Sequence, residues 1–122
     1  MAEHPQADIP FVYKICPEDL WQEAVDAHIF GGAGIDLVDG FIHFSTADQV
    51  AVTADLHFNG VQGLVLVKIR TDGLGLIWEE SRGGQLFPHL YKDLPLAYVD
   101  DVYPMPLDGK GNHEFPPEIT PL

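Results

Sequence analysis

The segment Gly40–Thr46 carries residue types that are well suited to contact a ligand. A short strand is expected over Phe41–Phe44, and its alternation places Phe41, His43 and Ser45 on one face. An imidazole and a hydroxyl would then lie just before a helix N-terminus, whose free N–H groups and dipole favour anions. This combination predicts a site for a hydroxylated or anionic ligand. The alternative is a buried His43 bonded to a backbone carbonyl, with Ser45 as a helix cap only.

A second cluster lies in the segments Trp78–Glu80 and Phe87–Tyr91. If these segments form a hairpin, Glu79 and His89 lie on paired strands and can approach each other. A carboxylate that orients an imidazole is a common catalytic arrangement, and it is also a common surface salt bridge. The neighbouring aromatic side chains can either wall a ligand pocket or belong to the core: Trp78, Phe87 and Tyr91.

Other patterns that could carry chemistry are weaker. Cys16 is the single cysteine, which excludes an internal disulfide and a cysteine-based zinc site, and no GxSxG elbow supports a Cys16 or Ser45 nucleophile. Gly31–Gly34 follows a helix and lacks phosphate-loop spacing, so it predicts a helix stop and a flexible loop that can act as a lid. We expect no metal, since HxxxH, HExxH and HxH spacings are absent among the possible ligands: His43, His57, Glu79 and His89.

Charge and composition exclude several classes of protein. Six Lys and Arg against nineteen Asp and Glu give a net charge of −13, which disfavours nucleic acids and anionic membrane surfaces. The chain has 122 residues, of which 46% are hydrophobic, as expected for one globular domain. No apolar run approaches the roughly 18 residues of a membrane span, and the N-terminus lacks the features of a secretory signal. We therefore expect a cytoplasmic protein.

The order of the expected elements indicates an α+β fold. Residues 1–9 form a loose lead, residues 10–104 a single domain, and residues 105–122 a Pro- and Gly-rich tail that is extended over the surface or mobile. Ser45 or Thr46 is expected to cap the second helix in a capping box, and Pro88 to confine its strand to an edge, an end or a bulge. Two helices are expected, over 18–28 and from 45 or 46 to about 58, and six strands, over 10–16, 41–44, 64–70, 76–79, 86–91 and 96–103.

Several segments resemble one small bacterial family, the domain of unknown function 952 (DUF952) family. The resemblance covers roughly residues 11 to 104 and is most specific in the strings DGFIHFST (39–46) and LFPHLY (86–91). It extends to Tyr13-Lys14-Ile15, Trp21, Gln49, Trp78-Glu79, Ser81–Gly84 and Leu94-Pro95.

The resemblance implies an ADP-ribosyltransferase-like fold, in which two small sheets form a split β core with two short helices and NAD lies in the cleft between the sheets. The nearest branch is that of the RNA 2′-phosphotransferases, whose His-x-Ser element is similar to His43-Phe44-Ser45. His43 and Ser45 would then contact the nicotinamide ribose or a phosphate. Tyr13 and Lys14 would lie on the first core strand, where that branch usually has a His or an Arg.

The sequence thus predicts a domain that binds NAD or a related nucleotide such as ADP-ribose, with possible ADP-ribosyl transfer to a small molecule or a protein. The rival hypothesis is a binding or interaction module without chemistry, and a third is a metal-dependent hydrolase or isomerase. The expected catalytic residues are His43, Glu79 and His89. The expected ligand-binding residues are Tyr13, Lys14, His43, Ser45, Thr46, Phe87 and Tyr91.

Overall fold

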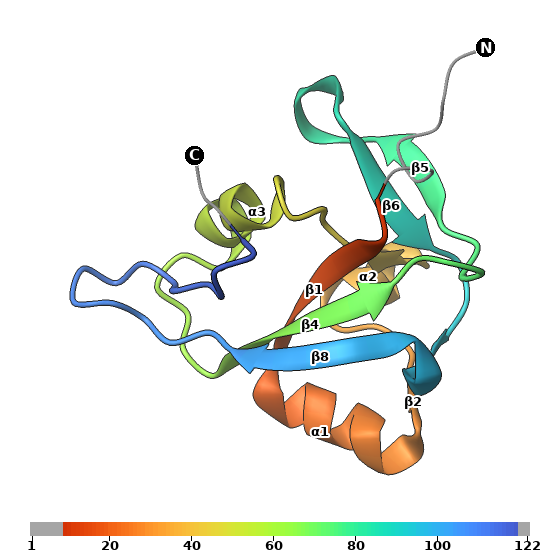
Figure 1. The fold of residues 1–122 in the computed structure, drawn as a ribbon, viewed down its shortest axis with the longest axis horizontal. Helices are drawn as coiled ribbons and strands as arrows, with labels where there is room; N and C mark the ends of the chain where they lie inside the picture. Colours follow the sequence, from red (N-terminus) through yellow and green to blue (C-terminus); the bar gives the residue numbers. More distant parts are fainter. Residues whose placement is uncertain (1–8, 120–122) are drawn as a thin grey trace.

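The computed structural model describes residues 9–119, so most of the expected N-terminal lead and the last three residues lie outside the described part. Two three-stranded antiparallel sheets and one two-stranded sheet form the β structure (Figure 1). The first sheet has the order β1-β4-β8, made of β1 Phe11–Pro17, β4 Leu64–Arg70 and β8 Val99–Pro104. The second has the order β3-β6-β5, made of β3 Ile42–His43, β6 Leu86–Leu90 and β5 Ile77–Glu80, and the third pairs β2 Ile29–Phe30 with β7 Leu94–Pro95.

Three helices accompany these sheets within residues 9–119: α1 Glu18–Ala27, α2 Ile35–Asp39 and α3 Val50–His57. The α+β class is confirmed, but there is one small sheet and one helix more than expected. The extra helix, α2, lies in the segment that was expected to be a flexible loop. It ends at Gly40, whose left-handed conformation (φ 84°) is one that a side chain rarely adopts. No helix of the described part is both long and apolar enough to cross a membrane.

The start of α3 differs from the expected capping box. Ser45 forms a β-bridge with Tyr13, in which each backbone N–H donates to the other residue's carbonyl (2.7 and 2.9 Å). This pairing keeps Ser45 extended, so α3 begins only at Val50. Gln49 still reaches back as a capping-box residue would, because its Oε1 accepts from the N–H of Thr46 at 3.0 Å. The expected helix N-terminus therefore does not adjoin His43 and Ser45.

Pro88 lies in the central strand of its sheet, so the expectation of an edge, an end or a bulge was wrong. The proline pairs with Trp78 of β5 and offers its carbonyl to the N–H of Phe44 at 3.0 Å. Proline has no N–H to donate to β3. The pairing of β3 with β6 therefore ends at His43, just before the position opposite Pro88. A 3₁₀ turn over Leu96–Tyr98 also replaces the beginning of the last expected strand.

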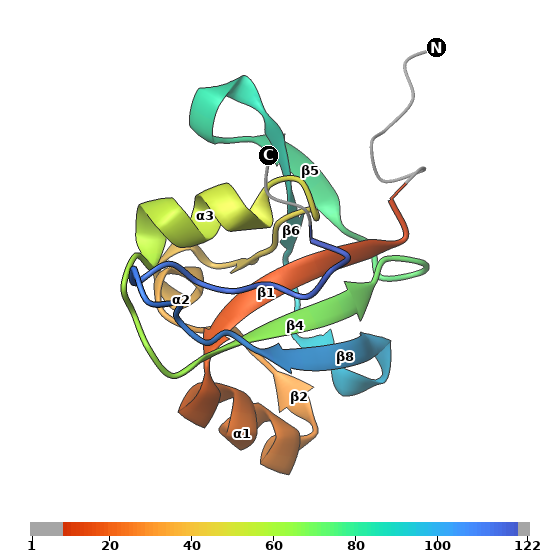
Figure 2. The ribbon, with the colours of Figure 1, turned by 60° about the vertical axis from the view of Figure 1, so that its left-hand side comes forward.

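The first sheet separates two hydrophobic clusters. Val12 and Cys16 of β1 belong to one cluster, and Tyr13 and Ile15 to the other, as strand alternation requires. The C-terminal segment crosses β1 beside α3 (Figure 2). It contributes buried Met105 and Ile119 to the second cluster, so part of the expected tail belongs to the core.

Glu118 fastens this segment to the sheet. Its carboxylate accepts from the hydroxyls of Tyr13 (2.5 Å) and Tyr103 (2.8 Å) and pairs with the ammonium of Lys68 (2.8 Å). The hydrogen bonds from Lys68 and then Tyr13 lower the pKa of Glu118 from 4.5 to about 2.

We expect Glu118→Gln to lower the free energy of unfolding by about 1 kcal/mol at neutral pH, because it removes an ion pair and weakens two hydrogen bonds. The folded-state pKa lies below the ordinary value, so the carboxylate stabilises the fold above about pH 4.5, and this contribution is lost as the pH falls toward about 2. Urea unfolding at several pH values measures the difference. Glu114→Gln, at an exposed position of the same segment, is the control. A difference that stayed constant down to about pH 3 would contradict the prediction.

Candidate functional site

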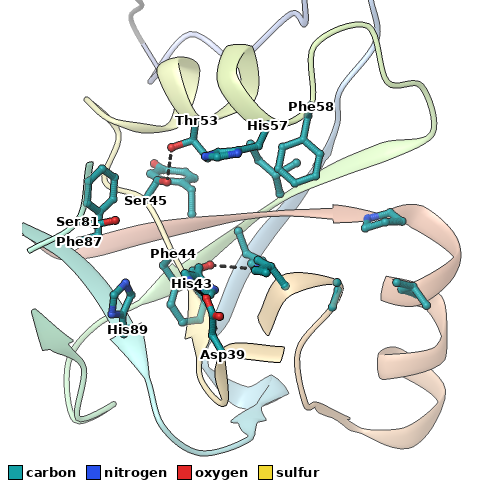
Figure 3. A pocket seen from close by; sticks show the side chains of 18 residues that line it. Asp39, His43, Phe44, Ser45, Thr53, His57, Phe58, Ser81, Phe87 and His89 are labelled. Carbon is teal, nitrogen blue, oxygen red and sulfur yellow. Dashed lines mark hydrogen bonds and ion pairs between the residues drawn. The ribbon is translucent and has the colours of Figure 1, made fainter. Parts of the chain in front are cut away.

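A pocket of about 680 Å³ lies between β1, α2, α3 and the sheet that contains β3 and β6. This volume is in the range of small-molecule sites. Figure 3 shows the walls: Thr53, His57 and Phe58 of the α3 region on one side, and Asp39, His43 and His89 on the other. The expected site residues that line it are Tyr13, Lys14, His43, Ser45, Phe87 and His89.

The carboxylate of Asp36, in the first turn of α2, organises one wall of the pocket. Its Oδ1 accepts from the ring Nδ1 of His43 (2.6 Å) and from the N–H of the same residue (3.1 Å). Its Oδ2 pairs with the ammonium of Lys14 (2.6 Å) and accepts from the N–H of Ala33 (3.0 Å). The sequence reasoning missed Asp36. The sequence signal was an aspartate among apolar residues, three positions before the start of the DGFIHFST string.

Burial and pairing compete at this cluster. Burial opposes the ionisation of Asp36, but the hydrogen bond from His43 and the charge of Lys14 together hold the pKa of its carboxyl below the ordinary value. Burial lowers the pKa of Lys14, and the charge of Asp36 opposes that shift. Lys14 also donates to the backbone carbonyl of His43 at 3.0 Å. Lys14 was expected to bind the ligand, and its charge is instead balanced within the protein by Asp36.

Both ring nitrogens of His43 face carboxylates. Nδ1 meets Asp36, and Nε2 lies 3.0 Å from Oδ2 of Asp39. Both nitrogens can donate only when the ring carries two protons and a positive charge. The ring is 31% exposed and bonded to carboxylates, so the alternative of a buried histidine satisfied by a backbone carbonyl was wrong.

His89 stands beside His43 on the adjacent strand. The two residues are direct partners in the pairing of β3 with β6, and their ring centroids are 5.2 Å apart. Nδ1 of His89 lies 2.7 Å from Oε1 of Glu79, which confirms that the hairpin brings these two side chains together. With Nδ1 engaged, Nε2 is the ring nitrogen that can meet a ligand.

Glu79 is not among the described residues that line the pocket. It can therefore act on the pocket only through its contact with His89. Its Oε1 also accepts from the hydroxyl of Tyr91 at 2.6 Å. The hydrogen bond from Tyr91, and then that from His89, holds the pKa of the Glu79 carboxyl below its ordinary value. The same bond to Glu79 raises the pKa of the Tyr91 hydroxyl. Glu79 is thus a positioning residue for His89.

The remaining expected site residues take different places. Phe87 lines the pocket, while Tyr91 and Thr46 lie outside the described lining and Trp78 packs against the first core cluster. Ser45 lines the pocket with its hydroxyl 3.0 Å from that of Thr53. Phe41 lies against both histidines, with ring centroids 4.5 Å from His43 and 4.3 Å from His89. Among residues 9–119 no group of three or more His, Cys, Asp and Glu side chains is placed to hold a metal ion.

The chain belongs to the DUF952 family, described as a protein of unknown function, whose model matches residues 15–102, well over half of the chain. It is similar to the crystal structure of protein CC0527 from Caulobacter crescentus, with 40% identity, a TM-score of 0.81 and coverage of 85% of this chain and 93% of that chain. The solution structure of CC0527 is also similar, with 40% identity, a TM-score of 0.75 and coverage of 84% and 90%. No curated protein gives a significant match.

We expect Asp36→Asn to lower the free energy of unfolding by about 3 kcal/mol, because it leaves the buried ammonium of Lys14 without its counter-charge. Asp39→Asn is the matched control: its carboxylate meets the same imidazole but is 38% exposed, so a loss of no more than about 1 kcal/mol is expected. Denaturant unfolding of both variants measures the losses. Equal losses would show that Asp36 does not organise this wall.

Proposed function

We propose that the pocket binds NAD or a related nucleotide that carries ADP-ribose, and that its two histidines serve ADP-ribosyl transfer to a small molecule or a protein. The observation that carries this proposal is the pair His43 and His89, each oriented by carboxylates, on one pocket of about 680 Å³. The net charge of −13 argues for an acceptor other than RNA.

Membership of the DUF952 family supports the proposal through the resemblance of that family to the ADP-ribosyltransferases and, more distantly, to the RNA 2′-phosphotransferases. In this interpretation, the β1-β4-β8 and β3-β6-β5 sheets correspond to the two halves of a split β core. The pocket has lining residues from both sheets, as an NAD cleft in such a core would have. His43-Phe44-Ser45 would be the His-x-Ser element, and all three residues line the pocket.

Ligand contact would start at Nε2 of His43. Its partner Asp39 is 38% exposed, and ion pairs of this kind are weak, so a ribose hydroxyl or a phosphate oxygen can replace the carboxylate. The hydroxyl of Ser45, which lines the same pocket and lies 3.0 Å from that of Thr53, would bond a second ribose hydroxyl, and the ring of Phe87 would pack on nicotinamide. Because Asp36 neutralises Lys14, the phosphates gain little from that cation, and we expect modest affinity.

In the proposed reaction, the bond between the nicotinamide nitrogen and C1′ of the ribose breaks, and its electron pair leaves with nicotinamide. C1′ becomes cation-like, and a hydroxyl or amine of the acceptor attacks it and loses a proton. Nε2 of His89 would take that proton, while Glu79 stabilises the imidazolium that forms. An interaction that strengthens as this charge develops favours the transition state over the ground state.

A binding module without chemistry is the second candidate. It is favoured by the position of Glu79, which faces His89 and Tyr91 and not the pocket lining. A carboxylate so placed cannot stabilise a ribose cation by direct contact. The two candidates make the same prediction for binding and opposite predictions for nicotinamide release.

Calorimetric titration of the purified chain with NAD and with ADP-ribose tests the binding. We expect both ligands to bind and His43→Ala to weaken their binding roughly tenfold, because the substitution removes a hydrogen-bonding imidazole from the pocket. His113→Ala is the matched control, since His113 bonds the carbonyl of Val61 away from the pocket lining. Absence of heat at millimolar concentrations of both ligands would overturn the nucleotide proposal.

Release of nicotinamide from bound NAD tests the chemistry. We expect His89→Ala to lower the release rate by roughly a hundredfold or more with little change in NAD affinity, because it removes the proton acceptor. Glu79→Gln should lower the rate less and alter its pH profile, as expected for a residue that acts through His89. Binding without any release by the unmodified chain would favour the inert module.

A further inference from the structure

The pocket is elongated, and the two histidines occupy one end of it. β1 lines it from Tyr13 to Pro17, which is four residue steps, or about 13 Å, along an extended strand. His43 and Ser45 stand beside the Tyr13 end, since Tyr13 bridges Ser45 and Lys14 reaches the His43 carbonyl. The Pro17 end therefore lies well beyond the reach of the paired imidazoles.

The other end has a different chemical character. Thr53 stands over Ser45, and His57 follows one helical turn further along α3, with Phe58 next to it. Figure 3 shows Phe58 and His89 on opposite sides of the pocket. Phe58 packs against the core cluster that contains Ile15. Three further apolar residues line the pocket with them: Pro17, Leu20 and Ile35.

We propose that this end binds the adenine base of the nucleotide, with the ring of Phe58 as a stacking surface and His57 as a hydrogen-bonding partner; the assignment rests on the proposed function. The bond that breaks must lie beside His89, which fixes the nicotinamide ribose at that end. The rest of the ligand must then extend along β1 toward Pro17. A flat, neutral base suits an aromatic and apolar wall. Lys14 is the only lysine or arginine in the described lining, and it lies at the opposite end, where it bonds the His43 carbonyl.

Two ligands that each correspond to one half of NAD distinguish the two ends of the pocket. AMP should shift the ring resonances of His57 in proton NMR spectra, and nicotinamide mononucleotide should shift those of His43 and His89. His57→Gln, His43→Ala and His89→Ala each remove one set of ring resonances and so assign the three signals. Shifts of His43 and His89 without any shift of His57 on addition of AMP would overturn the assignment.

Phe58→Leu tests the stacking surface while keeping apolar volume. We expect it to weaken ADP-ribose binding roughly fivefold or more, the range of base–aromatic stacking, and to leave nicotinamide mononucleotide binding within about twofold. Phe115→Leu is the matched control, because Phe115 packs against the same core cluster as Phe58 but does not line the pocket.

The outcomes separate this assignment from the function on which it rests. Binding of ADP-ribose with equal affinity to Phe58→Leu, Phe115→Leu and the unmodified chain would overturn the adenine site and leave the nucleotide proposal intact. Absence of binding by NAD, ADP-ribose and AMP alike would overturn both. Weaker ADP-ribose binding by Phe58→Leu alone supports both.

Discussion

The wall of the pocket that carries His43 depends on one buried carboxylate. Asp36 holds the ammonium of Lys14, the imidazole and N–H of His43 and the N–H of Ala33, and so ties β1, α2 and β3 together. An unpaired charge at this depth would be costly, so Lys14 and Asp36 each require the other. A side chain on Gly32 would come within 2.9 Å of the Asp36 Cβ, so a glycine is needed where the chain passes this carboxylate.

The second histidine is placed by strand register. His43 and His89 are direct partners across β3 and β6, and Phe41 fills the space against both rings. On the other side of β6, the β5 strand brings Glu79 to Nδ1 of His89, with Tyr91 on the same carboxylate oxygen. A shift of one residue in either pairing would turn His89 to the opposite face of the sheet, so the register of the short β3–β6 ladder determines whether the two imidazoles share one pocket.

Local patterns in the sequence correctly predicted the elements that depend on neighbouring residues, such as strands and hairpins. The β-forming run at Leu64–Arg70 and the hairpin that joins Glu79 to His89 follow from alternation and turn residues, and the structure has both. Asp36 could not be found in this way, because its importance comes from Lys14, which is distant in the sequence and adjacent in space. The prediction of where α3 begins failed for the same reason, because the long-range bridge of Ser45 to Tyr13 overrides a local capping signal.

The charge balance of the pocket bears on what can hold a ligand there. The charges of Lys14 and Asp36 compensate each other. Asp39 lies against Nε2 of His43 and would compensate a positive charge on that ring, so this wall of the pocket carries no net positive charge. The chain as a whole carries a net charge of −13, which repels a diphosphate at longer range. Affinity for a nucleotide in such a pocket must therefore come from hydroxyl contacts and from stacking of the bases. Phe87 at the histidine end and Phe58 at the far end are two of the aromatic residues that line the pocket, and we assign the stacking to them.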